Sequence, residues 1–123
     1  MNKLPSFLLL TVLLAGCAIN AVDVSPRQSY RPPGSKELWD ISGSLNSKYD
    51  QLTGVTQRYL SVYINETPVI NGGLSAMGTG ELIGRYNDHK VNSICTSEVK
   101  TETWMDMRCT ILIDNERAAT LTF

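Results

Sequence analysis

Apolar and polar residues alternate along most of the chain after residue 36. From Trp39 to Asn46, and again from Arg58 to Ile64, every second position is apolar or glycine, which predicts strands with one buried face. A helix over 36–60 is the alternative, but Gly43 and Gly54 lower the helix propensity of that segment. Shorter apolar runs bounded by turn residues predict further strands at 69–70, 81–86, 90–96, 107–113 and 117–123.

Turn residues separate these segments at intervals of roughly ten residues, which is typical of antiparallel sheets. The sequence therefore predicts an all-β domain over 36–123, a small antiparallel sheet of about six to seven strands folded as a barrel or sandwich. The segments 62–66 and 112–116 are similar, and we interpret both as hairpin turns rather than as a duplication. The chain has 123 residues, which is room for one domain.

Residues 17–35 lack a sustained apolar period. Pro26, Pro32 and Pro33 suppress helix, so we expect a flexible tether that precedes the domain. A flexible chain of this length spans about 25 Å on average, which would hold the domain away from whatever carries residue 17. The alternative is a proline-rich docking segment.

The first residues have the features of a secretion signal. A short positive segment ending at Lys3 precedes an apolar run over 4–14. That run is too short for a membrane-spanning helix, which needs roughly 20 apolar residues, but it suits a signal peptide. We expect residues 1–16 to be cleaved from the mature protein.

The sequence Leu14-Ala15-Gly16-Cys17 resembles the lipobox of bacterial lipoproteins. This resemblance implies that Cys17 becomes the lipid-bearing first residue and that the protein contacts a membrane through this lipid. Acylation of this kind gives an effectively permanent anchor. The following residue is Ala18, not aspartate, which by the same resemblance favours the outer membrane of a Gram-negative cell, with the domain facing the periplasm.

Two other cysteines, Cys95 and Cys109, form an even pair in an oxidising compartment. A hairpin centred on Glu102 would bring them opposite each other, so we expect one structural disulfide. A redox-active pair is the alternative, but such pairs usually lie two residues apart at the start of a helix.

Composition and motifs exclude several kinds of function. A formal net charge of −1 lacks the basic excess of a nucleic-acid binder. His89 is the only histidine, in an expected surface turn, and no common metal or catalytic motif occurs, so we expect no metal, no cofactor and no enzymatic activity. Asp106, Asp114 and Glu116 are interpreted as scattered surface acids.

These features together favour a lipid-anchored, non-catalytic envelope lipoprotein whose domain binds or scaffolds another envelope protein or a cell-wall component. Tyr59 and Tyr63, on the polar face of one strand, and Trp104, in the loop of the disulfide hairpin, are candidate contacts with that partner. One alternative is a periplasmic inhibitor of a cell-wall hydrolase, similar to lipoproteins that block lysozymes. Another is an exclusion lipoprotein carried by a phage or plasmid.

Overall fold

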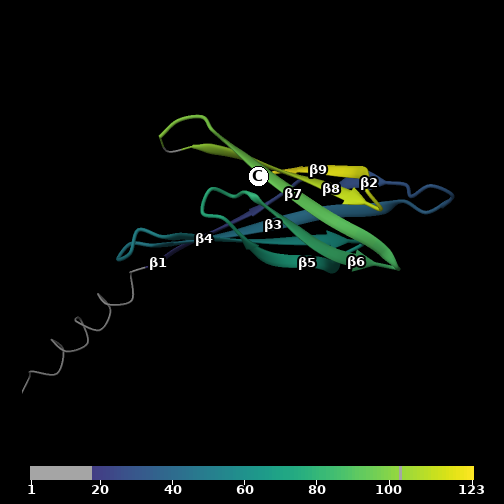
Figure 1. The fold of residues 1–123 in the computed structure, drawn as a ribbon, viewed down its shortest axis with the longest axis horizontal. Coiled ribbons are helices and arrows are strands. Elements are labelled where there is room, and N and C mark those ends of the chain that lie inside the picture. The colour runs from purple at the N-terminus through teal and green to yellow at the C-terminus, as the bar shows by residue number, and fades with distance from the viewer. Residues whose placement is uncertain (1–17, 103) are drawn as a thin grey trace, which may run out of the picture.

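The protein is a sandwich of two antiparallel sheets, one against the other (Figure 1). A computed structural model describes residues 18–102 and 104–123. In these residues no helix is long and apolar enough to cross a bilayer. The all-β class predicted from the alternating pattern is confirmed, and the arrangement is a sandwich of two separate sheets.

The first sheet contains five strands in the order β1-β3-β4-β5, with β2 also paired to β3. The long strand β3 carries β2 along its first residues and β1 along the rest, on the same side. The strands are β1 (Ala18–Val24), β2 (Gln28–Tyr30), β3 (Trp39–Asp50), β4 (Thr56–Ile64) and β5 (Thr67–Leu74).

The second sheet is a four-stranded meander in which each strand pairs with the next along the chain. Two-residue turns with positive φ at both positions connect several strands of the two sheets, at 65–66, 87–88 and 114–115. Such turns match the twist of antiparallel hairpins. The strands are β6 (Gly80–Tyr86), β7 (His89–Val99), β8 (Met105–Ile113) and β9 (Glu116–Thr122).

The expected flexible tether over 17–35 is wrong for the residues that the structure describes. Residues 18–24 and 28–30 are β1 and β2, and both are hydrogen-bonded to β3. The alternating pattern missed them because β1 is an edge strand with both faces largely exposed, and β2 has only three residues. The domain therefore begins at Ala18 rather than near residue 36.

The core lies between the sheets and receives every second side chain of the central strands. Ile41, Leu60 and Ile111 are fully buried, and the alternation predicted their inward positions. Cys95 and Cys109 are directly opposite each other on β7 and β8, both are buried, and they form a disulfide as predicted. The remaining buried apolar side chains are Trp39, Leu45, Val62, Ile64, Ile70, Val91, Met107, Ile113, Ala119 and Leu121.

The side chain of Gln28 joins the two sheets along one edge. Its Oε1 accepts a hydrogen bond of 3.0 Å from the backbone N–H of Thr120, and its Nε2 donates to the Thr120 carbonyl. A carboxamide has one acceptor and a donor on neighbouring atoms, so here it takes the place of a paired strand. The edge of β9 is thus satisfied at this point by a residue of β2.

Antiparallel connection places the chain reversals at two opposite ends of the sandwich (Figure 1). One end, which we call the turn end, has the three two-residue turns and the loop 31–38. The other, which we call the loop end, has the loops 51–55 and 75–79, the connection between β7 and β8, and the start of β1.

Candidate functional site

The loop 31–38 projects from the turn end beyond the three tight turns (Figure 1). At its base, Tyr30 of β2 is paired with Trp39 of β3, and their ring centroids are 6.4 Å apart in an edge-on arrangement. Within the loop, the Ser35 N–H donates to the Pro32 carbonyl at 3.1 Å, and the Glu37 N–H donates to the Ser35 hydroxyl at 3.1 Å. These contacts give the loop a defined shape.

Trp39 is the centre of an aromatic cluster at this end. Its ring centroid lies 5.0 Å from that of Tyr86 and 5.3 Å from that of His89, in both cases edge-on. Such geometry suits the ring quadrupoles and adds to the free energy gained from burial. Trp39 is only 6% exposed, so it forms the floor of the cluster, whereas Tyr30, Tyr86 and His89 are partly exposed above it.

His89 is held by Asp114, the first residue of the turn between β8 and β9. The two side chains approach to 2.5 Å between Nδ1 and Oδ2, and the other carboxylate oxygen accepts the Lys90 N–H at 3.1 Å. These two hydrogen bonds, that of His89 first, lower the pKa of the Asp114 carboxyl below its ordinary value. The pair fixes the imidazole ring in one orientation against Trp39.

The Tyr30 hydroxyl is buried near this pair without a partner of good hydrogen-bond geometry among the described residues. Burial raises the pKa of this hydroxyl, and the nearby Glu116 carboxylate raises it further. The hydroxyl is shielded from solvent and lies beside the Glu116 carboxylate, so it belongs to the interior of the cluster.

Asn65, in the turn between β4 and β5, links the two sheets at the turn end. Its Oδ1 accepts the Asp40 N–H at 2.9 Å, and its Nδ2 donates to the Tyr86 hydroxyl at 3.1 Å. Arg27 adds an ion pair with Asp40 at 2.7 Å and a longer one with Glu66 at 3.6 Å. The hydrogen bond that Arg27 donates to Asp40 is the main reason why the pKa of the Arg27 guanidinium is raised.

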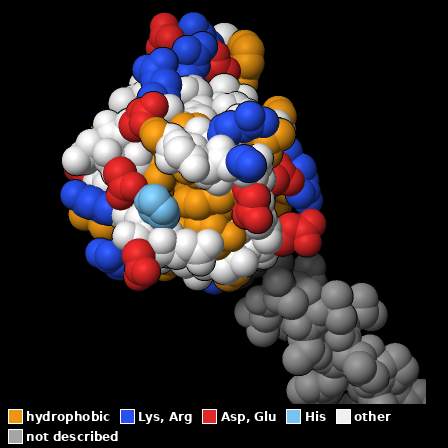
Figure 2. Space-filling view, turned by 90° about the vertical axis from the view of Figure 1, so that its right-hand side faces the viewer, with side chains coloured by type: hydrophobic (Ala, Val, Ile, Leu, Met, Phe, Trp, Pro, Cys, Tyr) orange, Lys and Arg blue, Asp and Glu red, His pale blue; other side chains and the backbone are white. Residues whose placement is uncertain are grey.

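Figure 2 looks onto the turn end and shows hydrophobic side chains exposed at its centre, with the histidine and several acidic side chains around them. An apolar centre inside a polar border is typical of protein interaction surfaces. The surface is assembled from β2, β3, β6, β7 and the turn 114–115, so it exists only when both sheets have formed.

The sequence-based candidates lie elsewhere. Cys17 is outside the described residues. Tyr59 and Tyr63 share the outer face of β4, as predicted, but Trp104 is in the loop between β7 and β8, on the other sheet. The structure therefore places the two tyrosines and the tryptophan on different parts of the molecule.

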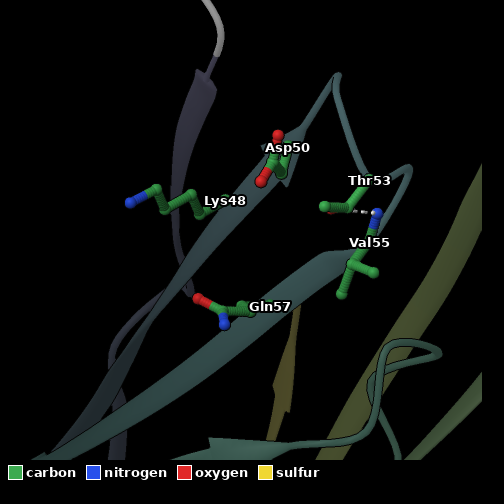
Figure 3. A pocket seen from close by; sticks show the side chains of 5 residues that line it. All are labelled: Lys48, Asp50, Thr53, Val55 and Gln57. Carbon is green, nitrogen blue, oxygen red and sulfur yellow. Dashed lines mark hydrogen bonds between the residues drawn. The ribbon is translucent and has the colours of Figure 1, made fainter.

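Tyr63 also lines a concavity of about 320 Å³ on the outer face of the first sheet, where β1 ends and β2 has not yet begun. Arg27 and Glu66, from the turn end, form another part of its wall. A second concavity, of about 380 Å³, lies at the loop end beside the β3–β4 hairpin (Figure 3) and is lined by Lys48, Asp50, Thr53, Val55 and Gln57.

The turn end combines an aromatic cluster, a His–Asp pair and a loop of defined shape. Residues 18–102 and 104–123 contain no group of three or more histidine, cysteine, aspartate or glutamate side chains placed to hold a metal ion. A His–Asp pair can orient an imidazole as a general base, but it needs a nucleophile or a water beside the ring. The His89 ring contacts Asp114 and Trp39.

Sequence reasoning missed this cluster because each member had a common explanation. The sequence pattern predicts a surface turn at His89 and a strand at Trp39. It predicts scattered surface acids at Asp114 and Glu116. The available signal was the pair of two-residue turns at 87–88 and 114–115, since hairpins of known register place His89 beside Asp114. The contact between Trp39 and Tyr86 has no such local signal, because it joins the two sheets.

No protein-family model, curated protein or solved structure matches this chain. Function is therefore inferred from the residues and their geometry.

Proposed function

We propose that the protein is a lipid-anchored envelope lipoprotein whose turn end binds another envelope component. Cys17 carries the lipid, the anchor lies in the outer membrane, and the domain faces the periplasm. The observation that supports this proposal best is the arrangement of the two ends. The strand that follows Cys17 starts at the loop end, and the projecting loop 31–38 and the aromatic cluster are at the opposite end.

Three features of the turn end favour recognition of a partner. The loop 31–38 is held by internal hydrogen bonds and two prolines, which lowers the entropy lost on binding. Leu38 exposes 56% of its surface beside the cluster, and a leucine in such a place gains free energy when a partner covers it. Tyr86 and His89 are partly exposed above Trp39, and exposed rings of this kind favour recognition. The role is non-catalytic, with no cofactor and no nucleic acid.

The anchor is tested by metabolic labelling with radioactive palmitate in a Gram-negative host. The wild-type protein should incorporate label and fractionate with the outer membrane, whereas Cys17→Ser should be unlabelled. Equal labelling of the two proteins would contradict lipidation of Cys17.

The binding surface is tested by site-specific photocrosslinking in intact cells. A photoreactive residue at position 38 should give a discrete adduct, and the same residue at position 59, on the outer face of β4, serves as the control. Leu38→Asp, with the photoreactive residue placed at Lys36, should abolish the adduct. An adduct only from position 59 would transfer the interface to the tyrosine face of the first sheet.

Inhibition of a cell-wall hydrolase is the second candidate, and the projecting loop favours it. A narrow loop of fixed shape can enter the cleft of an enzyme that cuts a polymer, which a flat sheet face cannot do. The mature protein in detergent should then inhibit lysozyme at micromolar concentration, and Leu38→Asp should relieve the inhibition. Full lysozyme activity at that concentration of wild-type protein would reject this candidate for lysozyme.

A further inference from the structure

Large apolar side chains that are exposed gather at the loop end. Leu52 is 81% exposed and Trp104 is 60% exposed, and both lie in loops that project from this end. Among the described residues the turn end has one comparable side chain, Leu38, whereas the loop end has seven: Ile19, Tyr49, Leu52, Val55, Met77, Val99 and Trp104. Single exposed apolar residues are ordinary, but a group of them at one end of a small domain indicates a surface that binds a protein or a membrane.

The β3–β4 hairpin carries Leu52 in its loop. Figure 3 shows this loop with Asp50, Thr53 and Val55 labelled. The Asp50 carboxylate accepts the Leu52 N–H at 2.9 Å, and the Asp50 carbonyl accepts the Gly54 N–H at 2.8 Å. The Thr53 hydroxyl accepts the Val55 N–H at 3.4 Å, and Gly54 has a φ of +71°, a conformation that glycine adopts readily. These hydrogen bonds pair several backbone groups within the loop and fix its shape, while Leu52 and Val55 stay exposed.

The β7–β8 hairpin carries the other main apolar residues of this end. The Trp104 carbonyl accepts the N–H groups of Lys100 at 3.0 Å and of Thr101 at 3.1 Å, which closes the loop. The indole ring has an apolar body and one N–H donor, and tryptophan is enriched at the level of lipid headgroups for this reason. Lys100, in the same loop, is partly exposed and forms an ion pair of 3.2 Å with Glu98.

The lipid anchor would lie at this same end. Ala18 is paired with Asp50, the residue that starts the loop containing Leu52. Cys17 is joined to Ala18 by one peptide bond, so their Cα atoms are about 3.8 Å apart. The expected tether does not separate the two, because residues 18–24 belong to the sheet.

We propose that the loop end docks onto the lipid bilayer that holds the anchor, with Leu52 and Trp104 at the level of the headgroups. This proposal rests on lipidation of Cys17, which is part of the proposed function. The lipid anchor alone would attach the domain to the bilayer at one point. The two apolar hairpins add further points of contact, so the sandwich stands on the membrane with its turn end directed away from it.

Tryptophan fluorescence of the mature, lipidated protein tests the docking. The chain has two tryptophans, and Trp39, 6% exposed at the far end, acts as an internal reference. The protein is reconstituted in vesicles of phosphatidylethanolamine and phosphatidylglycerol, with or without a lipid that carries a quencher near its headgroup. Wild-type emission should fall in the quencher vesicles. The Trp104→Phe variant, changed only in an exposed loop, should show equal emission in both.

A matched pair of variants tests the contribution of the hairpin. Leu52→Glu should reduce the quenching of Trp104, whereas Leu38→Glu, the same change in an exposed loop at the turn end, should leave it at the wild-type level. Equal quenching in the two variants would overturn the role of Leu52.

Flotation of the same vesicles separates the two proposals. Protein that floats with the vesicles but shows no quenching of Trp104 keeps the anchor and overturns the docking. Wild-type protein that does not float, and behaves like Cys17→Ser, overturns the anchor and the docking together. Flotation with quenching that is lost in Trp104→Phe supports both.

Discussion

Asp114 has two structural roles. Its backbone, at a φ of +50°, begins the turn between β8 and β9, and its carboxylate accepts hydrogen bonds from His89 and from the Lys90 N–H. Aspartate tolerates this backbone conformation better than most residues, so one side chain serves both the turn and the aromatic cluster. The consequence is that the geometry of His89 depends on a residue 25 positions away.

The pKa of the Asp114 carboxyl should therefore lie below its ordinary value and should rise in His89→Ala, because the largest cause of the shift is removed. A folded-state pKa below the unfolded value means that the carboxylate stabilises the fold above the unfolded pKa. This stabilisation is lost as the pH falls through the folded pKa. The pKa of the Asp114 carboxyl is measured in the wild-type protein and in His89→Ala by following its NMR chemical shift as the pH is changed. An identical pKa in His89→Ala would contradict the assignment of the cause.

Gly84 should tolerate no side chain. A Cβ at this position would lie 1.9 Å from the Val69 carbonyl oxygen, so a methyl group would force β5 and β6 apart. We expect Gly84→Ala to lower the free energy of unfolding by about 1–3 kcal/mol, measured by urea denaturation.

Gly73→Ala is the matched control, because the nearest atom to its Cβ is 3.7 Å away. It should change stability by no more than about 0.5 kcal/mol. An equal loss in the free energy of unfolding in the two variants would mean that Gly84 is not required for the close approach of β5 and β6.

Among the elements, β1 and β2 are the strands that the alternating pattern of apolar and polar residues did not predict. The strands β3, β4, β8 and β9 were predictable because each buries every second side chain, and this alternation is visible in the sequence. β1 is exposed on both faces and is held by hydrogen bonds to β3, which leave no trace in hydrophobicity. A proline-rich segment that looks like a tether can therefore still belong to a sheet when a long neighbouring strand offers it an edge.

Gln28 should contribute to stability far more than its half-buried position in a short strand suggests. Gln28→Ala removes both hydrogen bonds to Thr120, and we expect a loss of about 1–2 kcal/mol in the free energy of unfolding. Hydrogen exchange of the Thr120 amide should become faster at the same time. Gln57→Ala, on the exposed face of β4, should change neither quantity, and an unaltered exchange rate in Gln28→Ala would mean that the edges are joined by other contacts.

For the whole molecule, the disulfide should supply a large part of the net stability. Cys95 and Cys109 are 14 positions apart and close a loop whose constraint on the unfolded chain stabilises by about 3 kcal/mol. The double variant Cys95→Ala/Cys109→Ala should lose this amount in urea denaturation at fixed temperature. Wild-type protein with reductant should match the double variant, and a difference between them would point to packing of the sulfur atoms.

The disulfide pairing was predictable from the sequence, because a hairpin centred on Glu102 fixes which residues face each other. The turn-end cluster was not, since Trp39 and Tyr86 belong to different sheets and only the packing of the two sheets brings them together. The grouping of apolar residues at the loop end was hidden in the same way, because Leu52 and Trp104 are far apart in the chain. Local pattern predicts strands, whereas surfaces arise from how the strands are connected.

The position of β1 also determines how the protein bears mechanical load. If the turn end and residue 18 are pulled apart, the force enters at residue 18 and runs parallel to the strands. The seven register pairs between β1 and β3, from Ala18↔Asp50 to Val24↔Ser44, are then loaded together in shear. A strand entering from the opposite direction would be peeled off one bond at a time. Tension along this axis thus acts on the whole β1–β3 ladder at once, which makes the start of β1 resistant to pulling.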